Sequence, residues 1–121
     1  MKRIRMIGVL ALVLMMAALA SPAAKAGRIG GPMSAVGMVP LGESVYYSMS
    51  FTEGDRAIVS VKGNGQSILH LLLYDTDGHI AIGVGGLDTK TVIMDVYRTG
   101  VFRVEVRNLG VRDSAFQLTT N

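Results

Sequence analysis

Residues 44–62, SVYYSMSFTEGDRAIVSVK, carry the pattern that decides the fold. Apolar side chains recur at every second position on both sides of a turn at 53–55. They are Val45, Tyr47, Met49 and Phe51 before the turn, and Ala57, Val59 and Val61 after it. A period of two residues places alternate side chains on opposite faces of a β-strand. The stretch therefore predicts two half-buried strands, 44–51 and 56–62, joined by a short turn.

Similar strand-forming runs separated by turns continue to the end of the chain. Further strands are predicted at 68–74, 79–84, 89–97, 101–108 and 115–120, separated by turns rich in Gly, Asn and Asp. No segment after Ala26 keeps a helical period. Strands spaced about 8–12 residues apart are typical of antiparallel sandwiches and barrels. We predict an all-β fold: a single antiparallel, jelly-roll-like β-sandwich of about seven strands over residues 43–121.

Residues 27–42 have a different composition. This segment is rich in Gly and small residues and contains Pro32 and Pro40. Such a composition predicts an extended, partly mobile lead-in to the domain. We expect it to touch the domain through Met38, Val39 and Leu41.

The first 26 residues are typical of a cleavable signal peptide. Three basic residues stand among the first five, residues 6–20 carry no charge, and Ala24-Lys25-Ala26 is a small-x-small cleavage site. The uncharged run is shorter than the ~20 apolar residues that span a bilayer. We therefore predict a secreted or periplasmic protein without a stable membrane anchor.

Cleavage of the signal peptide changes the net charge of the protein, and the remaining charge limits the classes of partner that it can bind. The whole chain has a formal charge of +3, but four of its 12 basic residues leave with the signal peptide, and eight remain against nine acidic ones. Without a basic stripe, the sequence argues against a nucleic-acid partner. The absence of cysteine excludes disulfides and thiol chemistry, so the hydrophobic core alone must hold the domain.

Three segments resemble the bacterial pre-peptidase C-terminal domain family. They are Thr52–Arg56 (TEGDR), Leu69–Gly78 (LHLLLYDTDG) and Thr99–Val106 (TGVFRVEV), in that order. The resemblance covers residues 42–121 and implies a jelly-roll-like β-sandwich of the kind appended to secreted peptidases, here standing alone. Some relatives bind calcium, collagen or polysaccharide. Phe102 stands where the family usually has Tyr, and Ile68 and His70 stand where relatives often have Asp.

The hairpin at 75–78 superficially resembles a calcium loop. The twelfth position counted from Asp75 is Gly86, which has no side chain to supply the required carboxylate. His70 and His79 flank this hairpin and would suit zinc or copper if they approached each other, although both also fit surface positions. We predict a turn that uses Asp75, Asp77 and Gly78 for their backbone preferences, with no metal and no cofactor.

The sequence offers no constellation for catalysis. No serine stands in a Gly-x-Ser-x-Gly setting, and two histidines beside one hairpin do not make a triad. Paired carboxylates for glycoside hydrolysis would need a cleft that so small a sandwich rarely provides. We predict no catalytic residues, and keep a small hydrolase only as a distant alternative.

The candidate contact surface lies on the strand at 68–74. If Leu69, Leu71 and Leu73 fill the core, Ile68, Leu72 and Tyr74 form an apolar strip on the outside. The lead-in, a second copy of the chain or a partner would cover this strip.

We interpret the chain as a non-catalytic exported accessory or binding module that acts by protein or envelope contact. The alternative is a calcium- or carbohydrate-binding module assisting a secreted enzyme. Its partner is accordingly an unidentified protein or polysaccharide, or a second copy in a homo-oligomer.

Overall fold

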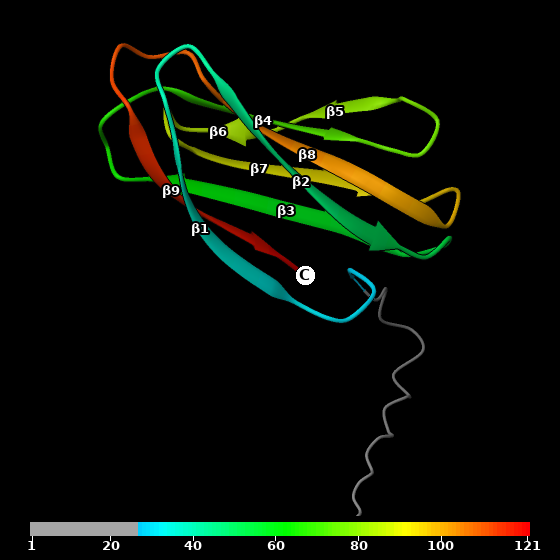
Figure 1. Cartoon of the computed structure of the whole chain (residues 1–121). Helices are drawn as coiled ribbons and strands as arrows, with labels where there is room; N and C mark the ends of the chain where they lie inside the picture. The colour runs from blue at the N-terminus through cyan, green and yellow to red at the C-terminus, as the bar shows by residue number, and fades with distance from the viewer. Residues whose placement is uncertain (1–26) are drawn as a thin grey trace, which may run out of the picture.

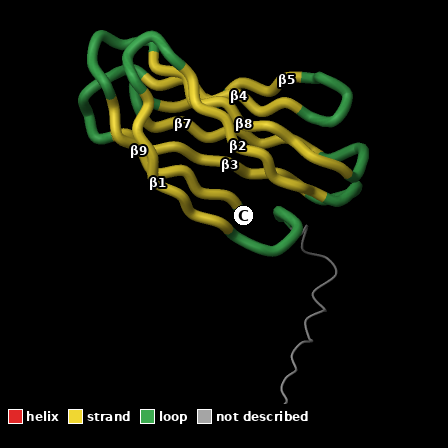
Figure 2. The backbone as a smooth tube through the Cα atoms, in the orientation of Figure 1, coloured by secondary structure: helices red, strands yellow, loops and turns green. Residues whose placement is uncertain are grey.

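The computed structural model describes residues 27–121; the predicted signal peptide, residues 1–26, lies outside the described residues. Nine strands follow one another along this part of the chain. They are β1 (Met33–Val39), β2 (Ser44–Phe51), β3 (Arg56–Gly63), β4 (Leu69–Tyr74), β5 (Ile80–Ile82), β6 (Val84–Gly85), β7 (Thr89–Asp95), β8 (Gly100–Asn108) and β9 (Ser114–Thr120). Figure 2 shows strands and loops throughout these residues, without a helix. Residues 27–121 thus hold no helix of the length and apolarity needed to cross a bilayer.

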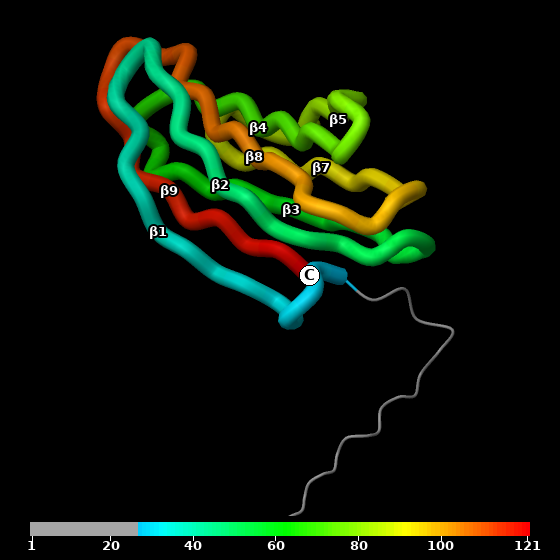
Figure 3. Tube along the Cα trace, turned by 45° about the vertical axis from the view of Figure 1, so that its right-hand side comes forward, coloured from blue at the N-terminus to red at the C-terminus, as the bar shows by residue number. Residues whose placement is uncertain are grey.

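The strands form two antiparallel sheets, which confirms the predicted β-sandwich. One sheet has the order β1-β9-β3-β7-β6 and the other β2-β8-β4-β5. The chain crosses from one sheet to the other between β1 and β2, and again between β8 and β9, as Figure 1 shows. The start of the described chain returns to its end, because the Arg28 N–H donates to the Asn121 carbonyl at 2.9 Å. Figure 3 shows the two ends side by side.

The core lies between the sheets and follows the predicted alternation. Leu69, Leu71 and Leu73 are fully buried, as are the inward residues of β3 and β8. The Phe51 and Phe102 rings meet edge to face, with centroids 5.2 Å apart and planes at 65°. Such packing supplies the stabilisation that the chain, without cysteine, must find in its core.

The segment predicted as a mobile lead-in contains an edge strand. β1 pairs with β9 along its whole length, from Met33 opposite Thr120 to Val39 opposite Ser114, so the sandwich begins before residue 43. Val39 is buried as expected. Met38 and Leu41 are 58% and 52% exposed and touch the domain through the backbone: Met38 pairs with Ala115, and the Leu41 N–H donates to Asp113 Oδ1 at 3.0 Å. The inward side of β1 is small at Gly37, where a Cβ would lie only 2.8 Å from the Phe116 ring. Because inward residues of β1 are small, the sequence lacks the alternation of large apolar residues from which a strand is predicted.

The single strand predicted at 79–84 is divided between the two sheets. β5 pairs with β4, whereas β6 pairs with β7 of the opposite sheet. The crossing occurs at Gly83, which is buried and donates its N–H to the Leu71 carbonyl at 2.7 Å. A Cβ at Gly83 would lie 3.0 Å from the Leu71 Cβ, so the close approach depends on glycine. This division and β1 account for nine strands instead of seven.

Candidate functional site

The strip of Ile68, Leu72 and Tyr74 lies outside the core. Leu69, Leu71 and Leu73 are 0% exposed, whereas Ile68 is 38% exposed and the other two outward residues are half-buried. The lead-in does not cover this strip, because β1 belongs to the opposite sheet. β4 has β8 on one side and β5 on the other. The outer face of the four-stranded sheet is therefore the surface around the predicted strip.

The strand register sets the neighbours on this outer face. Tyr74 stands opposite Arg103 of β8 and Ile80 of β5. Leu72 stands opposite Glu105 of β8 and Ile82 of β5. Ile80 and Ile82 are 54% and 65% exposed, so they extend the apolar strip to the edge of the sheet.

Arg103 lies between two tyrosines on the strands that flank β8. Its guanidinium carbon is 5.1 Å from the ring centroid of Tyr46 on β2 and 5.3 Å from that of Tyr74 on β4. Both distances fall within the range of cation–π attraction. No acceptor among residues 27–121 takes a hydrogen bond from this exposed guanidinium. We call Tyr46, Tyr74 and Arg103 the Tyr–Arg cluster.

Glu105 lies beside the Tyr–Arg cluster as a buried carboxylate on the outward side of β8. Although Phe102, Val104 and Val106 point into the core, Glu105 is only 1% exposed. Its Oε1 accepts a hydrogen bond from the Tyr74 hydroxyl at 2.6 Å. Its Oε2 accepts from the Ser44 hydroxyl at 2.6 Å and from Arg107 Nε at 2.8 Å. One carboxylate thus joins β2, β4 and β8.

The contacts of Glu105 keep it ionised. Burial alone would raise its pKa, but the hydrogen bonds from Ser44, Tyr74 and Arg107, with the charge of Arg107, lower the pKa of Glu105 to about 2. The same hydrogen bond raises the pKa of the Tyr74 hydroxyl. Tyr74 therefore remains a donor to Glu105 while its ring contacts Arg103. This chain of contacts fixes the cluster before any partner arrives.

Sequence reasoning missed this arrangement. Arg103, Glu105 and Arg107 are charged residues at every second position of one strand. This pattern predicts that all three point outward into solvent. Two of the three partners of Glu105 are remote in sequence: Ser44 is 61 residues away and Tyr74 is 31 away. Only the pairing of β2 and β4 with β8 brings them together. No local sequence signal reveals that register.

The structure separates His70 and His79, the two histidines considered above as ligands of one metal ion. His70 lies on β4 opposite Arg107, whereas His79 lies in the turn beside Asp75. One ligand atom each from Asp75, Asp77 and His79 fall within 4.8 Å of one another. Hydrogen bonds within the turn account for this approach: Asp75 Oδ1 accepts from the N–H groups of Asp77 and His79 at 2.8 Å each. These bonds outweigh the effect of burial and lower the pKa of Asp75.

A substitution in this turn separates a backbone role from a metal role. We expect Asp75→Ala to lower the free energy of unfolding by about 1 kcal/mol in metal-free buffer, because two backbone donors lose their acceptor. Asp77→Ala, which removes only an exposed ion pair with Arg98 at 3.3 Å, should cost less than about 0.5 kcal/mol. Urea melts with and without EDTA measure both values. A loss that appears only when calcium or zinc is present would identify a metal site instead.

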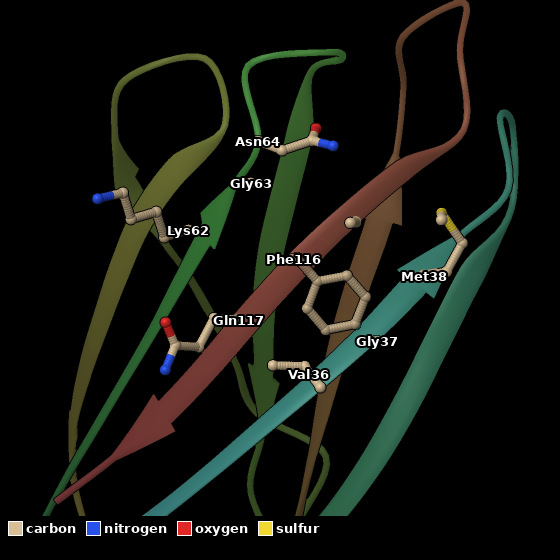
Figure 4. Close-up of a pocket in the computed structure, with 9 residues that line it drawn as sticks. Val36, Gly37, Met38, Lys62, Gly63, Asn64, Phe116 and Gln117 are labelled. Atoms are coloured by element: carbon tan, nitrogen blue, oxygen red, sulfur yellow. The ribbon is translucent and has the colours of Figure 1, made fainter.

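A groove of about 670 Å³ lies on the other sheet, over β1, β9 and β3. Figure 4 shows Val36 and Met38 on one side and Lys62 and Gln117 on the other. The Gln117 amide already donates to Ser34 Oγ at 3.0 Å. The groove offers mainly exposed aliphatic surface and few convergent polar groups to orient a small ligand. Its chemistry is less specific than that of the Tyr–Arg cluster.

No protein-family model matches this sequence, and no curated protein matches it. Two solved structures are similar in fold. The pre-peptidase C-terminal domain of a collagenase from Bacillus anthracis has a TM-score of 0.66 at 13% identity, over 81% of this chain and 93% of that domain. PliG of Aeromonas hydrophila, a periplasmic inhibitor of g-type lysozyme, has a TM-score of 0.58 at 13% identity, over 74% of this chain and 84% of that one. The chain therefore has the β-sandwich fold of a pre-peptidase C-terminal domain, as the sequence resemblance predicted.

Proposed function

We propose that the chain is an exported, non-catalytic binding module that contacts a partner protein through the outer face of its four-stranded sheet. The observation that carries this proposal is the Tyr–Arg cluster, in which two tyrosines hold an arginine without a polar acceptor among the described residues. Tyr and Arg are enriched in protein interfaces and among the residues that dominate binding energy. A preformed cluster of this kind loses little side-chain entropy on binding.

The surroundings of the cluster favour a protein over a polysaccharide. Ile80 and Ile82 place exposed aliphatic surface beside Tyr74, as in the apolar centre of a protein interface. Recognition of a sugar by stacking would use open aromatic faces, and Arg103 occupies one face each of Tyr46 and Tyr74. The same geometry leaves less ring surface for stacking, so it favours a protein over the carbohydrate-binding alternative.

The electrostatics of Glu105 support a structural role. A general acid working near neutral pH needs a pKa close to that pH, whereas the pKa of Glu105 is about 2. Its two oxygens are already occupied by Tyr74, Ser44 and Arg107. This carboxylate anchors the face and does not exchange protons with a substrate.

Export follows from the predicted signal peptide, and PliG, one of the structural neighbours, is itself periplasmic. We expect the exported protein to begin at Gly27, because Ala24 and Ala26 fit the small-residue requirement of signal peptidase. Intact-mass spectrometry of material recovered outside the cytoplasm measures the start directly. A full-length species that keeps residues 1–26 in a membrane fraction would contradict this prediction.

Cross-linking at two matched positions tests the proposed face. Ile82 and Ile93 are similarly exposed, at 65% and 59%, but they lie on opposite sheets. With a photo-reactive amino acid at position 82, we expect discrete protein adducts in the producing cells, and none from position 93. Ile82 is a cleaner position than Leu72, because a change at Leu72 also disturbs its neighbour Glu105.

The mass of the adduct identifies the class of partner. An adduct of twice the chain's own mass would identify the partner as a second copy of the chain. That result would support the protein-binding face and show that the protein forms a homo-oligomer. A heterogeneous adduct that shrinks on glycosidase treatment would overturn the protein proposal in favour of a polysaccharide. Equal labelling from both positions, or none from position 82, would also contradict the proposed face.

A further inference from the structure

We propose that Arg103 is the receptor for a carboxylate of the partner, supplied by an Asp or Glu side chain that docks among apolar neighbours. The inference rests on the proposed protein-binding face and names the chemistry that the face recognises. It starts from the Arg103 guanidinium, which donates to no acceptor among residues 27–121.

The contacts of Arg103 leave its N–H donors without an acceptor in the domain. Its guanidinium carbon lies 5.1 Å from the Tyr46 ring centroid and 5.3 Å from the Tyr74 centroid, and none of its N–H groups donates to an acceptor among residues 27–121. A guanidinium carries five N–H donors in a fixed planar fork that matches the two oxygens of a carboxylate. Arg103 thus presents a preformed bidentate donor whose orientation the fold has already set.

Three other arginines of the domain already have an acid. Arg56 pairs with Asp95 at 3.2 Å, Arg98 with Asp77 at 3.3 Å and Arg107 with Glu105 at 2.8 Å. Arg103 has no carboxylate within reach among residues 27–121. Its position between two aromatic rings further distinguishes it from an arginine that simply extends into water.

Glu105 does not pair with Arg103, and its ion pair is with Arg107 at 2.8 Å. Its Oε1 already accepts from Tyr74, and its Oε2 accepts from Ser44 and Arg107. The charge of Glu105 is balanced by Arg107, which leaves Arg103 as the unpaired charge of this face. Charge complementarity therefore calls for an acidic group on the partner.

The surroundings favour a protein carboxylate over a polyanion. Phosphate or sulfate polymers are recognised by stripes of several basic residues. Here one unpaired guanidinium stands opposite Tyr74, and the apolar side chains of Leu72, Ile80 and Ile82 lie beyond Tyr74 on β4 and β5. This pattern fits one acidic side chain flanked by apolar contacts.

The first test measures cross-linking from position 82 in three backgrounds. Arg103→Gln should lower the adduct yield by about tenfold or more, because it removes the charged fork. Arg112→Gln is the matched control, since Arg112 is also exposed and lies outside the sheet, in the loop before β9. We expect wild-type yield and an unchanged melting temperature from this control. Arg103→Gln should lower the melting temperature by only a few degrees, through loss of the two cation–π contacts, and should stay folded at the temperature of cross-linking.

The outcomes distinguish the inference from the proposed function. An unchanged yield in Arg103→Gln would overturn the carboxylate receptor and leave the protein-binding face intact. No adduct in the wild-type background would overturn the proposed face, and the receptor with it. Cross-linked peptides from the partner should contain Asp or Glu; peptides without either would also overturn the inference.

A second test uses the unaltered exported chain and does not depend on the folding of a variant. Sodium acetate serves as the carboxylate probe, with sodium chloride at equal ionic strength as its control. In nitrogen-15 NMR, we expect acetate to shift the Arg103 Nε–H resonance along a saturating curve and to leave that of Arg112 nearly unchanged. Equal, linear shifts at both arginines would overturn the inference.

Discussion

Phe102→Ala is expected to lower the free energy of unfolding by about 3–5 kcal/mol. The ring is 1% exposed and lies on β8, between β2 and β4 in its sheet. It contacts the Phe51 ring edge to face, with centroids 5.2 Å apart. Truncation removes both the buried area and this contact, and leaves a cavity that the paired strands cannot close. Urea melts followed by circular dichroism measure the loss.

Val101→Ala is the matched control for this prediction. Val101 is the neighbouring residue of the same strand, but it is 61% exposed. We expect its substitution to cost less than about 1 kcal/mol, the span of strand propensities. A larger loss in Val101→Ala than in Phe102→Ala would mean that the inward and outward sides of β8 are exchanged.

The central strands were predictable because their pattern is unambiguous. β4 alternates with leucines at 69, 71 and 73, and a period of two forces Ile68, Leu72 and Tyr74 to the other side. The same period of two in residues 101–108 sets Phe102, Val104 and Val106 on one side, which the structure buries. The local sequence is enough to predict which side chains of a single strand face the core, and the structure confirms that prediction for these strands.

β1 and the division at Gly83 were not predictable in the same way. In β1 the inward positions include Ala35 and Gly37, while the outward Val36 is 79% exposed, so hydrophobicity marks the wrong side. At Gly83 the chain changes sheets while the sequence continues without an evident break. Both features depend on partners that are distant along the chain.

The candidate site was predictable in part. The sequence located the outer strip but not the Tyr–Arg cluster, whose members belong to β2, β4 and β8. Nor did it show that Glu105 would be buried. Both arrangements arise from the register of three strands, which single-strand patterns do not specify.

Glu105→Gln is expected to lower the free energy of unfolding by about 2–3 kcal/mol at neutral pH. One carboxylate oxygen becomes an amide NH₂. In the place of Oε2 it sets a donor against the Arg107 Nε–H, and in the place of Oε1 it forces the Tyr74 hydroxyl to change from donor to acceptor. The lost charge also leaves Arg107 without its acid. Glu53→Gln is the control: Glu53 lies in an exposed turn, so this change should alter stability by no more than about 0.5 kcal/mol.

The pH dependence of the same variant is a stricter test. Folding lowers the pKa of Glu105 from its usual 4.5 to about 2, so the folded state binds this proton less readily than the unfolded state. The resulting stabilisation is fully present above about pH 4.5 and is lost as the pH falls towards 2. Its size, converted from the shift, is about 3 kcal/mol. We expect urea melts between pH 6 and pH 2 to show wild type losing its advantage over Glu105→Gln by roughly that amount. A difference that stays constant over this range would mean that Glu105 is not held as a low-pKa carboxylate, and the anchoring of Tyr74 beside Arg103 would lose its electrostatic basis.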